Sequence, residues 1–151
     1  MKTNVEGDSL WVKKYGEGMN DYTSCVHQTT DGGYIMTGYA DGDSVQPFAG
    51  SRLLLLKVDS LGDTMWVQKW GGMSAGNWVE QTSDGGFMIV GETESFGAGQ
   101  TDVWLLRTDS LGDTLWTRTF GGEHHDNASS GQQTSDGGFI IAGNLSMLYP
   151  T

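Results

Sequence analysis

Residues 112–116 read Gly-Asp-Thr-Leu-Trp, and this short phrase occurs almost unchanged at two earlier places in the chain. Residues 62–66 read Gly-Asp-Thr-Met-Trp, and residues 7–11 read Gly-Asp-Ser-Leu-Trp. Neighbouring copies are roughly 50 residues apart in a chain of 151 residues. A period of this length indicates that one structural unit is built several times.

A second phrase has the same period. Residues 82–87 read Thr-Ser-Asp-Gly-Gly-Phe, which recurs at 134–139 and, as Thr-Thr-Asp-Gly-Gly-Tyr, at 29–34. Asp followed by two glycines is typical of a hairpin turn, because the carboxylate accepts backbone N–H groups and glycine adopts positive φ. The period is long for a solenoid coil and matches a β-propeller blade. Both phrases together predict a propeller architecture.

Residues 74–121 contain one complete repeat, in which short apolar runs alternate with glycine-rich turns. We expect its four strands at 77–82, 87–90, 102–107 and 114–120. The run Phe-Met-Ile-Val at 87–90 is apolar without interruption, which fits a strand covered on both faces. Apolar residues nowhere recur at helical spacing for three turns. The sequence therefore predicts an all-β fold of four-stranded antiparallel blades, each about 50 residues long.

The chain (1–151) is expected to be a single domain of about three blades. Two blades are complete, at 20–72 and 73–122, and a third is split between 7–16, with a fourth strand at 8–15, and 122–151. Residues 145–149 are a further candidate strand for the split blade. Closed propellers have about four to eight blades, so we expect two chains to close a six-bladed ring, each completing the broken blade of the other. The alternative is that the chain is a fragment of a longer repeat array.

The composition excludes several classes of function. The chain has 19 acidic and 8 basic residues, and its formal charge of −11 repels nucleic-acid phosphates and anionic lipids. The single cysteine, Cys25, rules out an internal disulfide and a cysteine zinc cluster. No segment has the length of an apolar membrane span, and residues 1–6 lack the apolar stretch of a secretory signal. We therefore expect neither nucleic acid nor a membrane as a partner.

Three strings of the repeat carry a family resemblance: QTSDGGF (81–87), DVWLLRTDSLGDTLW (102–116) and TFGG (119–122). They resemble the tandem propeller-type repeats of large secreted or surface-anchored bacterial and archaeal proteins. The chain is similar, more remotely, to quinoprotein-like propellers, whose blades carry an Asp, a turn Gly and a Trp in the order of Asp109, Gly112 and Trp116. The resemblance implies an extracellular or cell-surface location and an adhesive, scaffolding or ligand-binding role.

The residues that every repeat shares are interpreted as structural. We expect the tryptophans of the fourth strands to pack between blades, and the Asp and Gly residues to form turns. These structural residues are Trp11, Trp66, Trp116, Asp31, Asp84, Asp136, Gly62 and Gly112. Because they recur in several blades, they do not mark a single active centre.

Residues that differ between equivalent first strands are candidates for function. The innermost strand of a propeller blade lines the central channel, where ligands usually bind. His27, Glu80 and Gln132 occupy equivalent positions in the first strands, and Trp78 has no aromatic counterpart in the other blades. We therefore name His27, Glu80, Gln132 and Trp78 as channel-lining candidates for a glycan or protein ligand.

One loop carries residue types that bind metals. His124, His125 and Asp126 follow one another after a pair of glycines. Adjacent histidines on a strand point to opposite sides, and no third ligand is suitably spaced. We interpret these residues as a solvated loop, and we expect no metal site and no cofactor.

The sequence favours a non-enzymatic propeller module for structural display, self-assembly or binding. No catalytic nucleophile, phosphate loop or glycine-rich nucleotide motif stands out. One alternative is an enzyme with an active site at the propeller channel, of the quinoprotein-like or glycan-cleaving kind. A further alternative is a repeat-derived fragment whose one property is self-assembly. Near-identical blade frameworks favour a scaffold, because an enzyme needs chemistry in one blade that the others lack.

Overall fold

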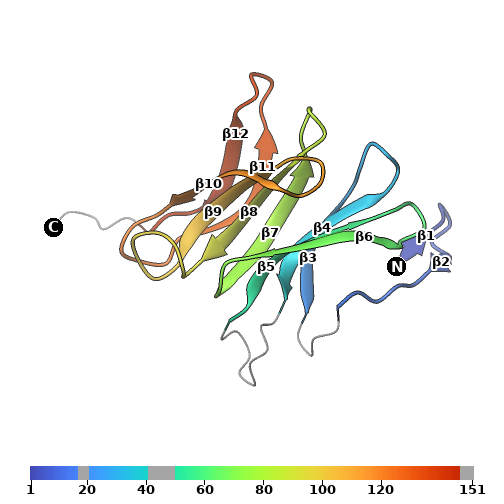
Figure 1. The fold of residues 1–151 in the computed structure, drawn as a ribbon, viewed down its shortest axis with the longest axis horizontal. Coiled ribbons are helices and arrows are strands. Elements are labelled where there is room, and N and C mark those ends of the chain that lie inside the picture. Colours follow the sequence, from blue (N-terminus) through green and yellow to red (C-terminus); the bar gives the residue numbers. More distant parts are fainter. Residues whose placement is uncertain (17–20, 41–49, 147–151) are drawn as a thin grey trace.

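The computed structural model describes residues 1–16, 21–40 and 50–146, and in these residues every regular element is a β-strand (Figure 1). The strands are β1 (Lys2–Thr3), β2 (Ser9–Trp11), β3 (Tyr22–Gln28), β4 (Tyr34–Ala40), β5 (Arg52–Val58), β6 (Thr64–Trp70), β7 (Ser74–Gln81), β8 (Phe87–Thr93), β9 (Asp102–Thr108), β10 (Thr114–Phe120), β11 (Asn127–Gln133) and β12 (Phe139–Asn144). The prediction of an all-β fold is confirmed for the described residues.

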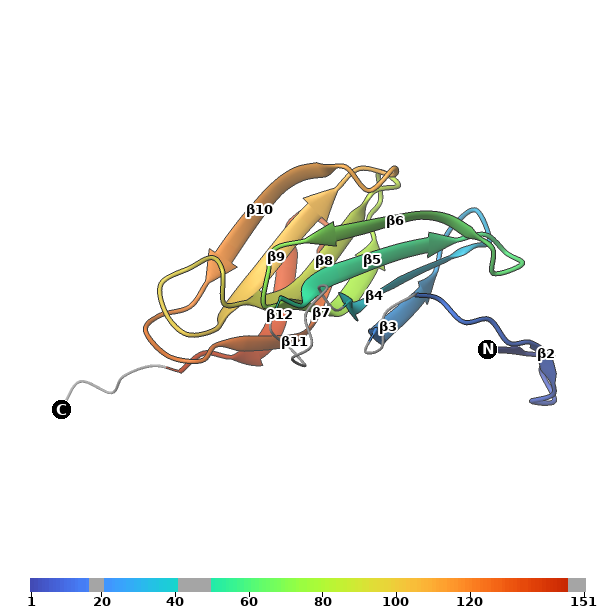
Figure 2. The ribbon, with the colours of Figure 1, turned by 60° about the horizontal axis from the view of Figure 1, so that its bottom comes forward.

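The strands form four antiparallel sheets in chain order. The first sheet consists of β3–β4–β5–β6 and the second sheet of β7–β8–β9–β10. The N-terminal hairpin is β1–β2, and the C-terminal hairpin is β11–β12. Figure 2 shows the second sheet between the first sheet and the C-terminal hairpin, with the N-terminal hairpin at the other end of the row.

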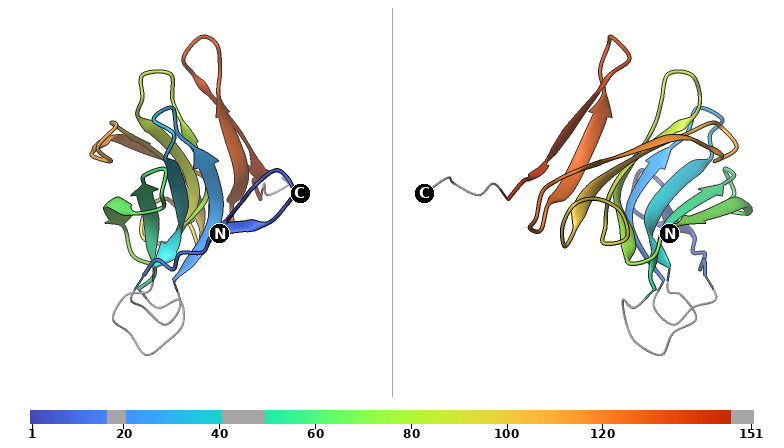
Figure 3. Two further views of the ribbon diagram at one scale, coloured as in Figure 1. Left: turned by 90° about the vertical axis from the view of Figure 1, so that its right-hand side faces the viewer. Right: turned by 60° about the vertical axis from the view of Figure 1, so that its left-hand side comes forward.

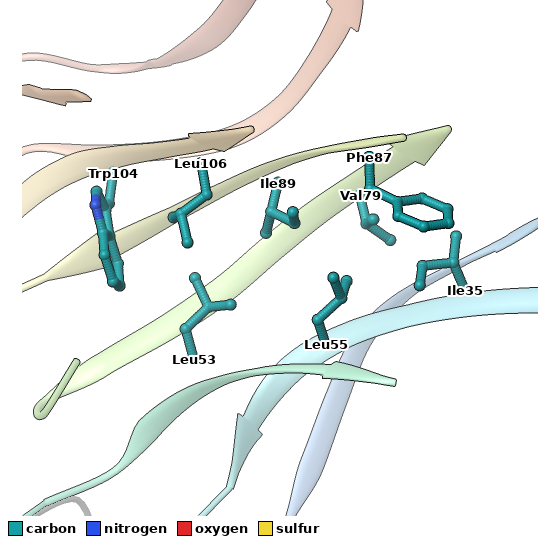
Figure 4. Close-up of a cluster of buried hydrophobic side chains, with 8 residues drawn as sticks. All are labelled: Ile35, Leu53, Leu55, Val79, Phe87, Ile89, Trp104 and Leu106. Atoms are coloured by element: carbon teal, nitrogen blue, oxygen red, sulfur yellow. The ribbon is translucent and has the colours of Figure 1, made fainter. Parts of the chain in front are cut away.

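The core lies between the faces of neighbouring sheets. Ile35, Leu53 and Leu55 of the first sheet pack against buried side chains of the second (Figure 4). The partners on the second sheet are Val79, Phe87, Ile89, Trp104 and Leu106. The opposite face of the second sheet packs on the C-terminal hairpin through a second apolar cluster.

The apolar run at 87–90 explains why the second sheet is covered on both sides. Successive side chains of a strand point to opposite faces. Phe87 and Ile89 therefore join the cluster with the first sheet, and Met88 and Val90 join the cluster with the C-terminal hairpin. All four residues are buried, as the uninterrupted apolar pattern predicts.

The structure corrects the expectations at the two ends of the chain. The opening strand is expected over 8–15, but only Ser9–Trp11 is a strand, and it pairs with a strand, Lys2–Thr3, that the sequence analysis does not predict. The expected strand at 145–149 begins with two residues that form no strand, and residues 147–149 lie outside the described residues.

Candidate functional site

The first strands of three successive units lie side by side and carry the candidate channel residues. β7 contacts β3 on one side and β11 on the other. Each of three candidates is the last residue but one of its strand and pairs with the second residue of the strand that follows. These candidates are His27, Glu80 and Gln132. The register therefore places all three at one equivalent position.

Three of the four candidates take part in contacts between neighbouring strands. The His27 ring meets the Trp78 ring edge to face, with 4.9 Å between the centroids and 69° between the planes. Glu80 Oε2 accepts a hydrogen bond from the Gln133 N–H (3.3 Å). Gln132 is exposed. The Trp78 indole N–H is buried and has no hydrogen-bond partner in the described part of the chain. These four candidates offer aromatic and polar contacts, and none of them is a nucleophile paired with a base.

In the two complete sheets and in the C-terminal hairpin, an aspartate closes the turn between the first and second strands. Asp84 Oδ1 accepts hydrogen bonds from the Thr82 hydroxyl (2.7 Å) and the Gly86 N–H (3.2 Å). These two bonds, together with the charge of Arg107, lower the pKa of Asp84. Asp31 and Asp136 accept the corresponding bonds in their own turns.

In both complete sheets a buried cation from the third strand pairs with this turn aspartate. Lys57 Nζ lies 2.8 Å from Asp31 Oδ2, and Arg107 Nη2 lies 2.6 Å from Asp84 Oδ2. Hydrogen bonds from Lys57, Thr29 and Gly33 lower the pKa of Asp31 to about 2. A buried charge requires a partner of this kind, since desolvation penalises an unpaired ion.

A glutamine connects each turn to the sheet that follows it. Gln81 Oε1 accepts a hydrogen bond from the Thr30 N–H of the first sheet (2.8 Å). Gln133 Oε1 accepts one from the Ser83 N–H of the second sheet (2.9 Å). The shared glutamine is therefore a contact between sheets, and it holds successive first strands in register.

The fourth-strand tryptophans contact the unit that follows them. Trp66 meets Phe87 of the second sheet edge to face and lies over the turn at Gly112, where an added Cβ would come within 2.9 Å of the indole. The centroid distances are 5.8 Å for Trp66–Phe87, 5.8 Å for Trp116–Phe139 and 6.3 Å for Trp11–Tyr34. Trp11 thus contacts the first sheet as Trp66 contacts the second.

The N-terminal hairpin has the geometry of a third and fourth strand. Lys2 pairs with Trp11 and Thr3 with Ser9, with a register shift between them. The same shifted register joins the third and fourth strands of both complete sheets. Asn4 closes this turn by accepting the N–H groups of two residues, as Asp59 and Asp109 do in their turns.

Lys2 and Asn4 are the residues that the sequence analysis missed. A signal for them was present in the chain. Lys2 stands five residues before the turn glycine of the first repeated phrase, where the other copies have Lys57 and Arg107. The repeat is hard to recognise here because position 4 is Asn, where the other two copies have Asp.

The loop with two histidines is held by its aspartate. Asp126 is buried, and its two oxygens accept the N–H groups of Gly122 (2.7 Å) and Ser146 (2.6 Å). His124 and His125 are exposed, and the Nδ1 atom of His125 lies 2.9 Å from the Thr101 hydroxyl. No group of three or more His, Cys, Asp or Glu side chains within the described ranges is arranged to hold a metal ion.

A cleft of about 470 Å³ adjoins this loop. Its acidic side chains include Glu92 and Glu94, and burial raises the pKa of Glu92.

In the described part of the chain, no helix is long and apolar enough to cross a membrane. The chain matches no protein-family model and no curated protein sequence.

Proposed function

We propose that the chain is a non-enzymatic β-propeller module that assembles head to tail with a second copy of itself. The observation that supports this is a difference in exposure between equivalent positions. Val79 on β7 is fully buried under the first sheet, whereas Val26, at the same position of β3, is 58% exposed. The face of the first sheet that carries Val26 points away from the second sheet. It is apolar there and is left uncovered by the described residues.

The opposite end of the row has the complementary face. Met88 on β8 and Ile35 on β4 are fully buried between sheets, while Ile140, at the same position of β12, is 62% exposed. Fully burying a side chain of this size contributes about 1.5–3 kcal/mol. Bringing the two ends together gives Val26 and Ile140 the environment that their counterparts have inside the chain.

A groove at the first end has room for the partner. It measures about 340 Å³ and runs along β3 and β4 beside the N-terminal hairpin. Its lining includes Trp11, Tyr34, Val26 and Met36. The corresponding face of the second sheet is filled by the first sheet. The shape of the groove thus fits a further strand pair of the same kind, and β11–β12 of a second copy is such a pair.

Two copies give a ring of plausible size. Each chain has two complete four-stranded sheets, and joining its C-terminal hairpin to the N-terminal hairpin of the next chain completes one more. Two chains then form six blades, within the usual range of about four to eight for closed propellers. In this ring the first strands line the channel, so His27, Glu80, Gln132 and Trp78 are its ligand-binding candidates. The resemblance to surface-protein repeats supports an extracellular scaffold or binding role.

Light scattering coupled to size-exclusion chromatography tests the assembly. We expect a single species with twice the 16.3 kDa chain mass at micromolar concentration. A stable monomer at these concentrations would refute self-assembly, and a mass that grows with concentration would show an open, head-to-tail filament instead of a two-chain ring.

Matched variants identify the faces involved. Val26→Glu and Ile140→Glu each place a charge on a face that becomes buried in the ring, so both should give folded monomers. Leu111→Glu is the control, because Leu111 is 66% exposed and belongs to the turn between β9 and β10, not to the strands β3 and β12 that carry Val26 and Ile140. A dimer that survives the first two substitutions as well as it survives the third would contradict this assembly.

A further inference from the structure

The two end hairpins carry complementary halves of one sheet. The N-terminal hairpin repeats the third and fourth strands, with turn hydrogen bonds Asn4 N–Asp8 O (3.0 Å) and Gly7 N–Asn4 O (3.2 Å). The C-terminal hairpin repeats the first and second strands, with Thr134 N–Gly138 O and Gly137 N–Thr134 O, both 2.9 Å. Placing β12 beside β1 would therefore restore the strand order of the complete sheets.

The complete sheets define the register of this pairing. Ile35 on β4 lies opposite Lys57 on β5, and Met88 on β8 lies opposite Arg107 on β9. Ile140 is the corresponding residue of β12, and Lys2 is the corresponding residue of β1. The register therefore puts Lys2 opposite Ile140 and Thr3 opposite Phe139.

Each hairpin also carries half of an ion pair. Asp136 forms the same turn as Asp31 and Asp84, with hydrogen bonds from the Thr134 hydroxyl and the Gly138 N–H, but no cation lies beside it among the described residues. Lys2 occupies the place of the paired cations and makes no ion pair within the described ranges. Its Nζ instead lies 5.7 Å from the centre of the Tyr34 ring.

One chain does not bring these halves together. The N-terminal hairpin lies against the first sheet and the C-terminal hairpin against the second, so two complete sheets stand between them (Figure 3, right). A second copy of the chain carries the missing half of each hairpin's sheet, in accordance with the ring size argued above.

We propose that Lys2 of one copy forms an ion pair with Asp136 of a second copy, with β1 and β12 paired antiparallel so that Lys2 lies opposite Ile140. This inference rests on the proposed function and specifies the contact, here called the joint, through which the copies assemble. The joint repeats between chains the pairs that Lys57 and Arg107 make within one chain.

A second ion pair follows from the same equivalence. Lys13 of the N-terminal segment forms an ion pair with Asp63 in the turn of the first sheet. Arg118 on β10 occupies the position of Lys13 in its own repeat, and Asp8 occupies that of Asp63. Arg118 is exposed and donates to the Thr117 carbonyl (2.7 Å). At the joint it faces Asp8 of the second copy.

One main-chain contact completes the joint. Gln81 and Gln133 each accept an N–H group from the turn of the preceding sheet. Gln28 is their counterpart on β3, and its Nε2 donates to its own turn at Gly32 (3.4 Å), as the Nε2 of Gln81 does at Gly85. The corresponding donor for the Gln28 Oε1 atom is the Ser135 N–H of the second copy.

Charge reversal tests the joint in the full chain. Lys2→Glu and Asp136→Lys each place like charges at the joint, so the dissociation constant of the dimer, measured by analytical ultracentrifugation, should rise about 10- to 100-fold. The double variant exchanges the two charges, and it should dimerise within a few-fold of the original chain. An equimolar mixture of the two single variants should form a heterodimer, since opposite charges face each other at both of its joints, whereas each homodimer has like charges at both.

Lys14→Glu is the matched control, because it makes the same change of net charge at an exposed lysine of the N-terminal segment outside the joint. Circular dichroism confirms that each variant is folded. If the original chain dimerises and the single reversals behave like Lys14→Glu, or if the double variant fails to recover, the joint is wrong while self-assembly stands. A monomeric original chain would overturn both proposals.

Discussion

Replacing Asp84 by Asn should lower the free energy of unfolding by about 2 kcal/mol. Asn has the same shape as Asp, so its side-chain carbonyl oxygen can still accept the Thr82 hydroxyl and the Gly86 N–H. The substitution therefore acts on the contact with Arg107: it removes the negative charge, and it replaces the acceptor Oδ2 by an NH2 group that cannot accept from the guanidinium.

The magnitude follows from the exposure of the two partners. The side chain of Arg107 is only 6% exposed, so it depends on this carboxylate for a charged partner. Breaking a fully buried ion pair by removing one partner costs about 3–5 kcal/mol. The Asp84 side chain is 65% exposed, so water screens the pair, and the loss falls near the lower end of the range of about 1.5–3 kcal/mol for hydrogen bonds to charged groups.

Urea unfolding followed by tryptophan fluorescence measures this loss. For a chain of this size, about 2 kcal/mol corresponds to a decrease of about 4–8 °C in Tm. All variants are compared at one chain concentration, since assembly makes the apparent stability depend on it. The matched control is Asp109→Asn. Asp109 also accepts two turn N–H groups, and Asn4 already forms the same two bonds at the equivalent position.

The control variant should therefore change the free energy of unfolding by less than about 0.5 kcal/mol. Equal effects of the two substitutions, whether both small or both large, would refute the reasoning. They would show that turn chemistry, and not the charge facing Arg107, determines the contribution of Asp84.

Two further predictions concern acid stability and the repeated turns. The pKa of Asp31 is lowered from its ordinary value of 3.8 to about 2, so its contribution to stability is complete above about pH 4 and is lost as the pH falls toward 2. Asp31→Asn should therefore flatten the acid side of the curve of unfolding free energy against pH. An unchanged curve in pH-dependent urea unfolding would contradict the pairing with Lys57. Gly112→Ala should lower Tm more than Gly85→Ala does. Both glycines have positive φ (86° and 87°), but only at Gly112 would the new Cβ meet an indole, that of Trp66, at 2.9 Å. Equal losses of Tm would show that this contact is relieved at no cost.

Much of the local structure could be predicted from the sequence. The fourth strand of the second sheet is expected at 114–120, and it is observed at Thr114–Phe120. The apolar run at 87–90 is expected to be covered on both faces, and it is. These features depend on the alternation of side chains along a strand and on turn residues a few positions apart, both of which the sequence displays directly.

The contacts between distant segments of one sheet were harder to predict. Lys57 and Arg107 differ in residue type, and they lie 26 and 23 residues from the aspartates with which they pair. The partners meet because a third strand runs beside a second strand in a particular register. Nothing within either short segment specifies this meeting, so the ion pairs became visible only in the folded chain.

The amino-acid sequence specifies the repeating unit, because each strand and turn is encoded by chemistry within a few residues. Which faces of those units are covered depends on how the sheets pack in the folded chain. Val26 and Val79 are the same residue type at equivalent positions, yet one is exposed and the other fully buried. The difference arises because burial depends on the neighbouring sheet, and the described chain supplies that neighbour to Val79 but not to Val26.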